Sequence, residues 1–202
     1  SMTRMGDMIQ TTPLIKGLKE KYPTAKITIL VTSDFSSAVS FIPGIDESIV
    51  LNFRQFDNEE NWKDLSWVKI YRYLESFMGE VKRKNFDLLV NLSHSKFSAL
   101  MVRYLGINNV VGFYCNDLGN RMTGHPWMQY FSVEVFNRNY NEFNLVEIFS
   151  TSGDVDLRGR EIEVVRPKSK TLRDGLIPSN FDSGEVLIGF QAGSSLEGRR
   201  WP

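Results

Sequence analysis

The sequence predicts an α/β protein with a Rossmann-like, doubly wound parallel sheet, and three observations support this fold class. Residues 25–32, 46–52 and 86–92 are apolar, β-branched runs, typical of strands that are buried on both faces. Residues 108–114 and 185–191 are weaker runs of the same kind. Helical stretches alternate with these runs, and such an alternation implies parallel strands joined by crossover helices.

The helical stretches are recognised by the spacing of their apolar residues. Residues 67–84 carry an apolar stripe at i, i+3, i+4 and i+7, made of Trp67, Ile70, Tyr71, Leu74, Phe77, Met78 and Val81. Residues 96–106 predict a shorter helix that ends at Gly106, and residues 138–152 are a further helical stretch. Residues 114–129 are polar and rich in glycine, so we expect a long loop there.

The composition excludes several classes of protein. The chain has 24 acidic and 24 basic residues, a net charge of zero that argues against a nucleic-acid binder. A single cysteine, Cys115, excludes a disulfide framework and favours the cytosol. No apolar run approaches the roughly 20 residues that a membrane-spanning helix needs, and we see no signal peptide.

The organisation of the chain predicts a domain boundary. We expect a first domain over residues 1–152, a charged interdomain connection over residues 153–170, and the start of a second domain over residues 171–202. In a doubly wound domain, the first glycine turn follows a strand. No strand is visible ahead of Gly6, so we expect that the first strand and most of the second domain are missing.

Asp7 in the segment "RMGDMIQTTP" has two interpretations. The spacing Asp7-x-x-Gln10 is that of a capping box, although Thr12-Pro13 offers a competing helix start. Alternatively, Asp7 lies in the first strand-to-helix turn, where ligands of open parallel sheets bind, and acts as a general base toward a substrate hydroxyl. Gly6 fits both interpretations, because it allows a sharp turn and close approach of a ligand.

The segment "GFQAGSSLEGRRWP" (residues 189–202) indicates a phosphate site. Its backbone amides and hydroxyls, followed by arginines, can hold phosphate oxygens, so a phosphate site is favoured over an ordinary surface turn. The spacing of Gly193 and Gly198 imitates a P-loop. Arg199 and Arg200 stand where that motif needs Lys and Ser or Thr, so a true P-loop is excluded.

These two segments together resemble glycosyltransferase family 9, the bacterial ADP-heptose:lipopolysaccharide heptosyltransferases. The opening "RMGDMIQTTPLIKGLKEKYPTAKITILV", the middle "NLSHSKFSALMVRYLGINNVVGF" and the closing "GFQAGSSLEGRRWP" occur in the order of that family. The resemblance implies a GT-B architecture, of which this chain holds the acceptor-side domain and the start of the donor domain.

The resemblance also implies the roles of particular residues. Asp7 matches the catalytic base, while Gly193, Ser194, Ser195 and Arg199 match positions that hold the donor diphosphate. Arg199 stands where the family often has lysine, and a guanidinium retains the charge. We expect acceptor contacts from Gly6, His94, Lys96 and Arg121.

The expected reaction is inverting transfer of heptose from ADP-heptose to the lipopolysaccharide inner core, with no metal or other cofactor. We expect a cytoplasmic protein acting at the inner face of the bacterial membrane, and expect the 202-residue chain alone to be inactive. Two alternatives stay open: a nucleotide-binding Rossmann module without catalysis, and a GT-B enzyme that uses another nucleotide sugar.

Overall fold

The computed structural model describes the chain except residues 1–3, 57–66, 135–141, 157, 159 and 166–202. The chain divides into two compact units, residues 1–166 and 167–202, and the second lies outside the described residues. The expected strand over residues 185–191 and the expected domain start at residue 171 therefore also lie outside them, and the domain boundaries stay a prediction. None of the described helices is both long and apolar enough to cross a lipid bilayer.

The first two strands form a parallel pair. β1 (Thr28–Thr32) pairs with β2 (Glu47–Leu51), with Thr28 opposite Glu47. Both strands begin one or more residues later than the sequence predicted. The Asp46 carboxylate explains the register, because it accepts hydrogen bonds from the Ile27 amide at 2.6 Å and from the Lys19 ammonium.

The next three strands form a second sheet. β3 (Leu89–Asn91) pairs in parallel with β4 (Val110–Cys115), and β4 pairs in antiparallel with β5 (Arg121–Thr123). The prediction of a long loop over residues 114–129 was wrong. A tight turn from Asn116 to Asn120 makes β4 and β5 a hairpin instead.

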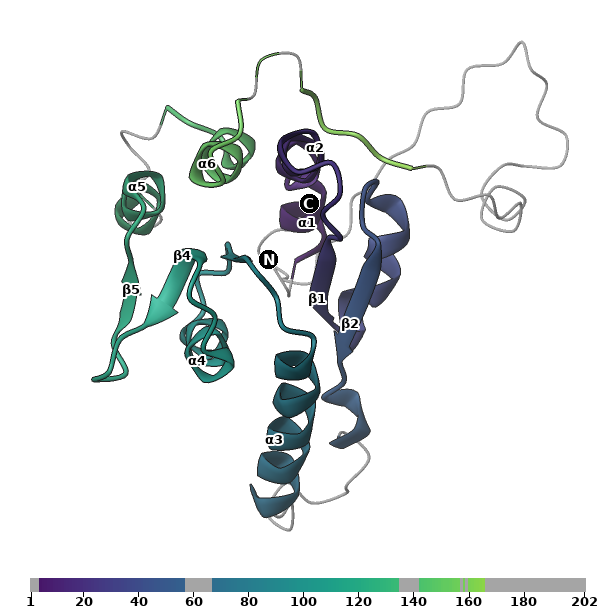
Figure 1. Ribbon diagram of the computed structural model, residues 1–202, viewed down its shortest axis with the longest axis vertical. Helices are drawn as coiled ribbons and strands as arrows, with labels where there is room; N and C mark the ends of the chain where they lie inside the picture. The colour runs from purple at the N-terminus through teal and green to yellow at the C-terminus, as the bar shows by residue number, and fades with distance from the viewer. Residues whose placement is uncertain (1–3, 57–66, 135–141, 157, 159, 166–202) are drawn as a thin grey trace, which may run out of the picture. The chain divides into compact units, whose positions relative to one another are not determined.

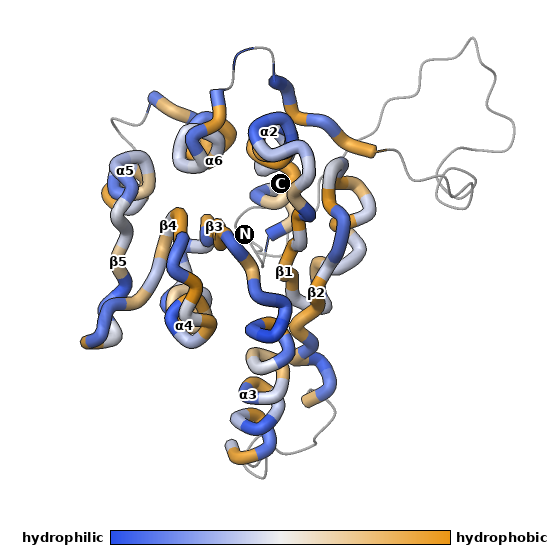
Figure 2. Tube along the Cα trace, in the orientation of Figure 1, coloured by the Kyte–Doolittle hydropathy of each residue, from blue (hydrophilic) through white to orange (hydrophobic). Residues whose placement is uncertain are grey.

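The parallel pairs and the helices between them confirm the α/β class. Within the described residues the hydrogen-bonded ladder is divided, however, into one sheet ordered β1-β2 and another ordered β3-β4-β5. Apolar residues predominate along β3 and β4, as expected of strands between covering layers (Figure 2).

The two predicted central helices are present. α3 (Trp67–Arg83) connects the two sheets, and α4 (Lys96–Leu105) packs beside β4 (Figure 1). α4 ends at Gly106, whose φ of +65° is the left-handed conformation of a helix C-terminus. The predicted apolar stripe of α3 is buried only toward its C-terminal end, since Trp67 is 81% exposed.

One hydrophobic cluster joins α3 to its neighbours. Phe77, Met78 and Val81 of α3 pack with Leu51 of β2 and with the buried side of α4. α3 thus contacts both sheets through its second half.

Six further helical segments complete the described part of the chain. They are α1 (Met5–Ile9), α2 (Thr12–Lys21), the 3-10 helices η1 (Ser33–Phe41) and η2 (Arg54–Phe56), α5 (Pro126–Glu134) and α6 (Leu145–Ser152). α6 begins later than the predicted residue 138, because Asn144 and Glu147 form a reciprocal capping box that fixes its start.

Candidate active site

Asp7 is the third residue of α1, a helix of five residues. The adjacent Met8 is fully buried and packs with Val31, near the carboxyl end of β1. Met8 therefore fixes α1 against that end of the sheet, which is where ligands bind in open α/β folds. The sequence predicted this neighbourhood for Asp7 because of the glycine before it.

The prediction that Asp7 caps a helix was wrong. Arg4 is the N-cap residue of α1, in extended conformation, and it makes no side-chain capping bond. The competing start at Thr12 is displaced by one residue, because Thr11 is the N-cap of α2 and Pro13 is its second residue. Asp7 instead lies within the first turn, where a negative charge is favoured by the helix dipole.

The Asp7 carboxylate is available for chemistry. Among the described residues it accepts no hydrogen bond and forms no ion pair. The side chain is partly exposed, and the neighbouring Gly6 is exposed with open space around the position of a Cβ. Gly6 belongs to a helix and is not among the positive-φ glycines, so the prediction that it provides a sharp turn was wrong.

A second group of polar residues follows β3. Asn91, at the end of this strand, is buried, and its amide nitrogen donates hydrogen bonds to the Phe113 carbonyl at 2.8 Å and to Ser98 Oγ at 3.3 Å. The Asn91 amide oxygen accepts from the Ser93 backbone nitrogen at 3.2 Å. One side chain thus ties β3, β4 and α4 together and shapes the turn that carries His94.

His94 and Arg121 are in direct contact. Arg121 Nη1 donates to His94 Nδ1 at 2.9 Å and to the His94 carbonyl at 2.7 Å. The guanidinium carbon lies 5.2 Å from the centroid of the Phe113 ring, within the range of a cation–π interaction. The His94 ring also packs edge-on against Phe113 at 5.0 Å and against Phe131 at 5.8 Å.

The environment keeps His94 neutral. Burial lowers the pKa of His94, and the adjacent positive charge of Arg121 lowers it further. Since Nδ1 accepts from a guanidinium, the proton of the neutral ring belongs on Nε2.

Sequence reasoning named His94 and Arg121 separately, and the structure brings them together. Asn91 and Phe113, which hold the pair in place, were not predicted from the sequence. The turn "NDLG" between two short β-type runs was the available signal for the hairpin that presents Arg121.

The other predicted residues are not joined to this pair. Lys96 is the exposed first residue of α4, and no described contact links it to His94 or Arg121. No hydrogen bond or ion pair among the described residues links Asp7 to them either. The predicted diphosphate residues Gly193, Ser194, Ser195 and Arg199 lie outside the described residues.

No protein-family model matches the sequence. The chain is 35% identical over 103 residues to lipopolysaccharide heptosyltransferase 3 of Escherichia coli strain K12, an alignment that covers 50% of this chain and 26% of that protein. A second lipopolysaccharide heptosyltransferase 3 from Escherichia coli is 32% identical over 100 residues, or 50% of this chain and 27% of that one. The chain thus spans about a quarter of the length of the curated relatives it matches.

One solved structure shares the fold over almost the whole chain. It is the glycosyl transferase family 9 protein of Veillonella parvula DSM 2008, with a TM-score of 0.65 and 17% identity, covering 99% of this chain and 55% of that one. At this identity the likeness concerns the fold alone. Taken with the two curated relatives, it confirms that this chain resembles glycosyltransferase family 9, the family of the lipopolysaccharide heptosyltransferases.

Proposed function

We propose that the full protein is an inverting glycosyltransferase that moves heptose from ADP-heptose to the inner core of lipopolysaccharide. The observation that carries this proposal is the similarity to two lipopolysaccharide heptosyltransferases over half of this chain. The carboxylate of Asp7, which has no partner among the described residues and follows Arg4 near the carboxyl end of β1, supplies the group that such chemistry requires.

In this mechanism Asp7 is the general base. Its carboxylate takes the proton of an acceptor hydroxyl, and the oxygen attacks the anomeric carbon of the donor sugar from the face opposite the diphosphate. The bond from the anomeric carbon to the diphosphate oxygen breaks, ADP leaves with the electron pair, and the anomeric configuration inverts. A carboxylate that is not paired with a cation among the described residues suits this role, because it remains free to accept the proton.

Arg121 is proposed to bind an anionic group of the acceptor. Its Nη1 atom is used by His94, whereas Nε and Nη2 have no hydrogen-bond partner among the described residues. These two nitrogens can contact a carboxylate or phosphate in a bidentate manner. His94 then serves to orient the guanidinium, and exposed Lys96 adds positive charge at the start of α4.

The donor side of the proposal depends on residues 189–202. Gly193, Ser194 and Ser195 would hold the diphosphate through amides and hydroxyls, and Arg199 would balance the negative charge that develops as ADP leaves. In this scheme no metal is used. The reaction would take place at the cytoplasmic face of the membrane, where an anionic, lipid-linked acceptor would be met.

The test is a transfer assay with the full-length natural protein, ADP-heptose and a lipopolysaccharide core that lacks heptose. We expect the Asp7→Asn variant to lose activity by a factor of about 10² to 10⁴, the usual contribution of a general base. Asn is nearly isosteric with Asp but accepts a proton far less readily, so the loss should appear in kcat rather than in binding of ADP.

Asp87→Asn is the matched control, because Asp87 is an exposed carboxylate. It precedes the amino end of β3, whereas Asp7 lies near the carboxyl end of β1. This variant should retain full activity. An Asp7→Asn variant as active as the wild type would exclude Asp7 as the base. A folded wild type that binds ADP and transfers no heptose would instead exclude the proposed substrates.

A further inference from the structure

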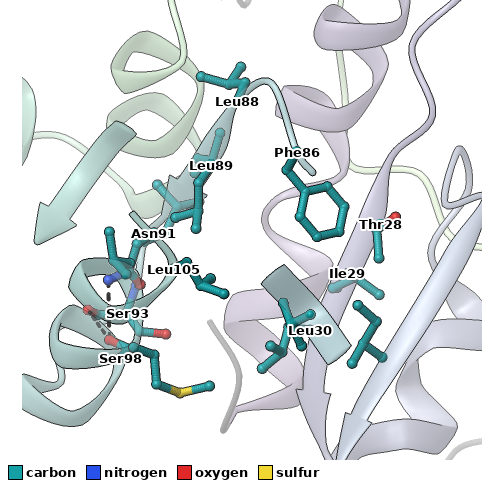
Figure 3. A pocket seen from close by; sticks show the side chains of 16 residues that line it. Thr28, Ile29, Leu30, Phe86, Leu88, Leu89, Asn91, Ser93, Ser98 and Leu105 are labelled. Atoms are coloured by element: carbon teal, nitrogen blue, oxygen red, sulfur yellow. Dashed lines mark hydrogen bonds between the residues drawn. The ribbon is translucent and has the colours of Figure 1, made fainter. Parts of the chain in front are cut away.

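α3 and α4 each have an inner side that packs on the rest of the fold and an outer side that does not. On the inner side of α4, Ser98 accepts a hydrogen bond from the Asn91 amide at 3.3 Å, and Leu105 packs with Leu89 of the same strand (Figure 3). On the inner side of α3, Phe77 belongs to the same hydrophobic cluster as Leu105. The inner sides are thus engaged by the fold, and the outer sides are left to meet another surface.

The outer sides carry large apolar residues that the fold leaves uncovered. They are Trp67, Val68 and Tyr71 of α3 and Phe97, Leu100 and Tyr104 of α4, with exposed fractions between 37% and 81%. Within each helix these residues are three or four positions apart, a spacing that brings them to one face. We call the six residues together the outer aromatic face.

Contacts between the two helices make the outer aromatic face continuous. Lys82 Nζ of α3 lies 6.0 Å from the centroid of the Tyr104 ring of α4. Near the start of α4, the ring of Phe53 lies 6.5 Å from that of Tyr73 on α3 and 6.0 Å from that of Phe97 on α4. The helices therefore lie side by side along α4. Single exposed apolar residues are common on protein surfaces, whereas a contiguous group of them marks a site of interaction.

The charges around the outer aromatic face are mostly positive. The exposed charged side chains of α3 and α4 are six cations and two carboxylates, namely Lys69, Arg72, Lys82, Arg83, Lys96 and Arg103, and Glu75 and Glu80. Arg103 pairs with the exposed Asp117. The whole chain, by contrast, has a net charge of zero, so positive charge is concentrated on these two helices.

This combination of side chains is complementary to an anionic bilayer. The rings of Trp and Tyr are favoured among lipid headgroups, and Lys and Arg are attracted to the negative surface of anionic phospholipids. A protein partner fits less well, because the cores of protein–protein interfaces are depleted of lysine.

We propose that the outer aromatic face of α3 and α4 docks the protein on a bilayer that contains anionic phospholipid, with Trp67 and Tyr71 among the headgroups and Lys82 beside the phosphates. The inference rests on the proposed function, in which the acceptor is lipid-linked, and assigns the surface that meets the membrane. Its test measures vesicle binding without donor or acceptor, so the docking surface and the transfer reaction can fail independently.

The test is co-sedimentation of the full-length natural protein with vesicles made of equal parts phosphatidylglycerol and phosphatidylethanolamine, or of phosphatidylcholine alone. We expect binding to the anionic vesicles that weakens with added salt and is at least about 10-fold weaker on the neutral vesicles. Trp67→Ser combined with Tyr71→Ser should weaken binding by about 10-fold or more. The matched control is Tyr22→Ser combined with Leu118→Ser, which removes exposed apolar side chains outside the outer aromatic face and should bind like the wild type.

Two single changes of charge should act in opposite directions. Lys82→Gln removes the cation beside Tyr104 and should weaken binding about fivefold, whereas Lys26→Gln, at an exposed lysine outside both helices, should leave it unchanged. Glu75→Gln removes an exposed carboxylate one helical turn from Tyr71 and should tighten binding by about 2- to 5-fold. A gain of binding cannot result from loss of folding.

Three results would overturn the proposal. They are absence of binding by the folded wild type, equal binding to anionic and neutral vesicles, and equal binding by the wild type and the folded Trp67→Ser/Tyr71→Ser variant. Sedimentation velocity without vesicles tests a second copy of the chain as the occupant. The double variant should leave the oligomeric state unchanged; a dimer that this variant converts to a monomer would overturn the proposal, because a second chain would then cover the face.

Discussion

The guanidinium of Arg121 donates hydrogen bonds to both the ring nitrogen Nδ1 and the backbone carbonyl of His94, 27 residues earlier in the chain. This double contact fixes the hairpin of β4 and β5 to the turn after β3. It also holds the imidazole as an acceptor beside a permanent positive charge. The pair is thus a single polar unit in which a change at either residue alters the other.

The first prediction concerns the pH dependence of stability. The pKa of His94 is lowered below its ordinary value of 6.5, so the unfolded chain binds this proton more readily than the folded chain. The free energy of unfolding should therefore be level above about pH 6.5 and decrease as the pH falls through the folded-state pKa. Denaturant unfolding between pH 7.5 and about pH 5 measures this. The His94→Gln variant, whose amide oxygen can accept from Arg121, should lack the decrease in this window; an unchanged slope would exclude His94 as its source.

The second prediction separates charge from burial at His94. Arg121→Gln removes the guanidinium charge, so the pKa of His94 should rise toward its ordinary value without reaching it, because burial remains the larger cause of the depression. Titration of the imidazole C–H signals by NMR measures the change. Arg103→Gln is the control, since Arg103 pairs with exposed Asp117. A pKa of His94 that stays the same in Arg121→Gln would contradict the assigned cause.

The third prediction concerns Asn91, the buried amide that joins β3, β4 and α4. Asn91→Ala leaves the Phe113 carbonyl without its donor and should lower the free energy of unfolding by about 1–3 kcal/mol. Asn109→Ala is the matched control, because its exposed amide makes a comparable bond to the Asp87 carbonyl and should cost less. Urea unfolding of both variants decides the point, and equal losses would show that burial of Asn91 adds nothing.

The fourth prediction uses two glycines with opposite surroundings. Gly112 has a φ of +94°, and a Cβ there would lie 2.0 Å from the Asn91 carbonyl oxygen, so Gly112→Ala should cost at least about 3 kcal/mol. Gly79 lies inside α3 with open space around it, so Gly79→Ala should stabilise the chain by about 0.5–1 kcal/mol. Thermal unfolding of the two variants should shift in opposite directions; a tolerated Gly112→Ala would mean that β3 and β4 can separate there.

The fifth prediction tests Gly6. Gly6→Ala meets no atom within 4 Å, and alanine favours a helix, so folding should be unaffected or slightly improved. If an acceptor approaches this backbone, as the resemblance to glycosyltransferase family 9 implies, the methyl group should raise the KM for the acceptor in the full-length protein. A KM equal to that of the wild type would remove Gly6 from the acceptor site.

Elements whose structure is decided by a local pattern could be predicted from the sequence. The apolar runs at β1 to β4 and the glycine at the end of α4 predicted these elements to within a few residues. The same patterns placed His94 in the turn after β3, because polar residues that follow a buried strand lie at the end of the sheet.

Features that depend on contacts between residues distant in sequence could not be predicted. The capping box predicted for Asp7 was lost because Met8 packs on Val31 and α1 begins three residues further upstream, with Arg4 as its N-cap. Similarly, the approach of Arg121 to His94 depends on the β4–β5 hairpin, whose short strands carry no strong alternation of apolar and polar residues. The turn "NDLG" does indicate the hairpin, but residue spacing alone indicates neither the start of α1 nor the contact of Arg121 with His94.

The division of the ladder between β1 and β3 has a consequence for the cooperativity of unfolding. In the described part of the chain, Phe77 and Val81 of α3 connect the β1–β2 side to α4 through side-chain packing, without a backbone ladder from β1 to β3. This shared core is the connection that couples the unfolding of the two sides, so we expect one transition while the packing is intact. Weakening the packing at Phe77 should separate the transition into two, and an exchange signal on each side would then report its own midpoint.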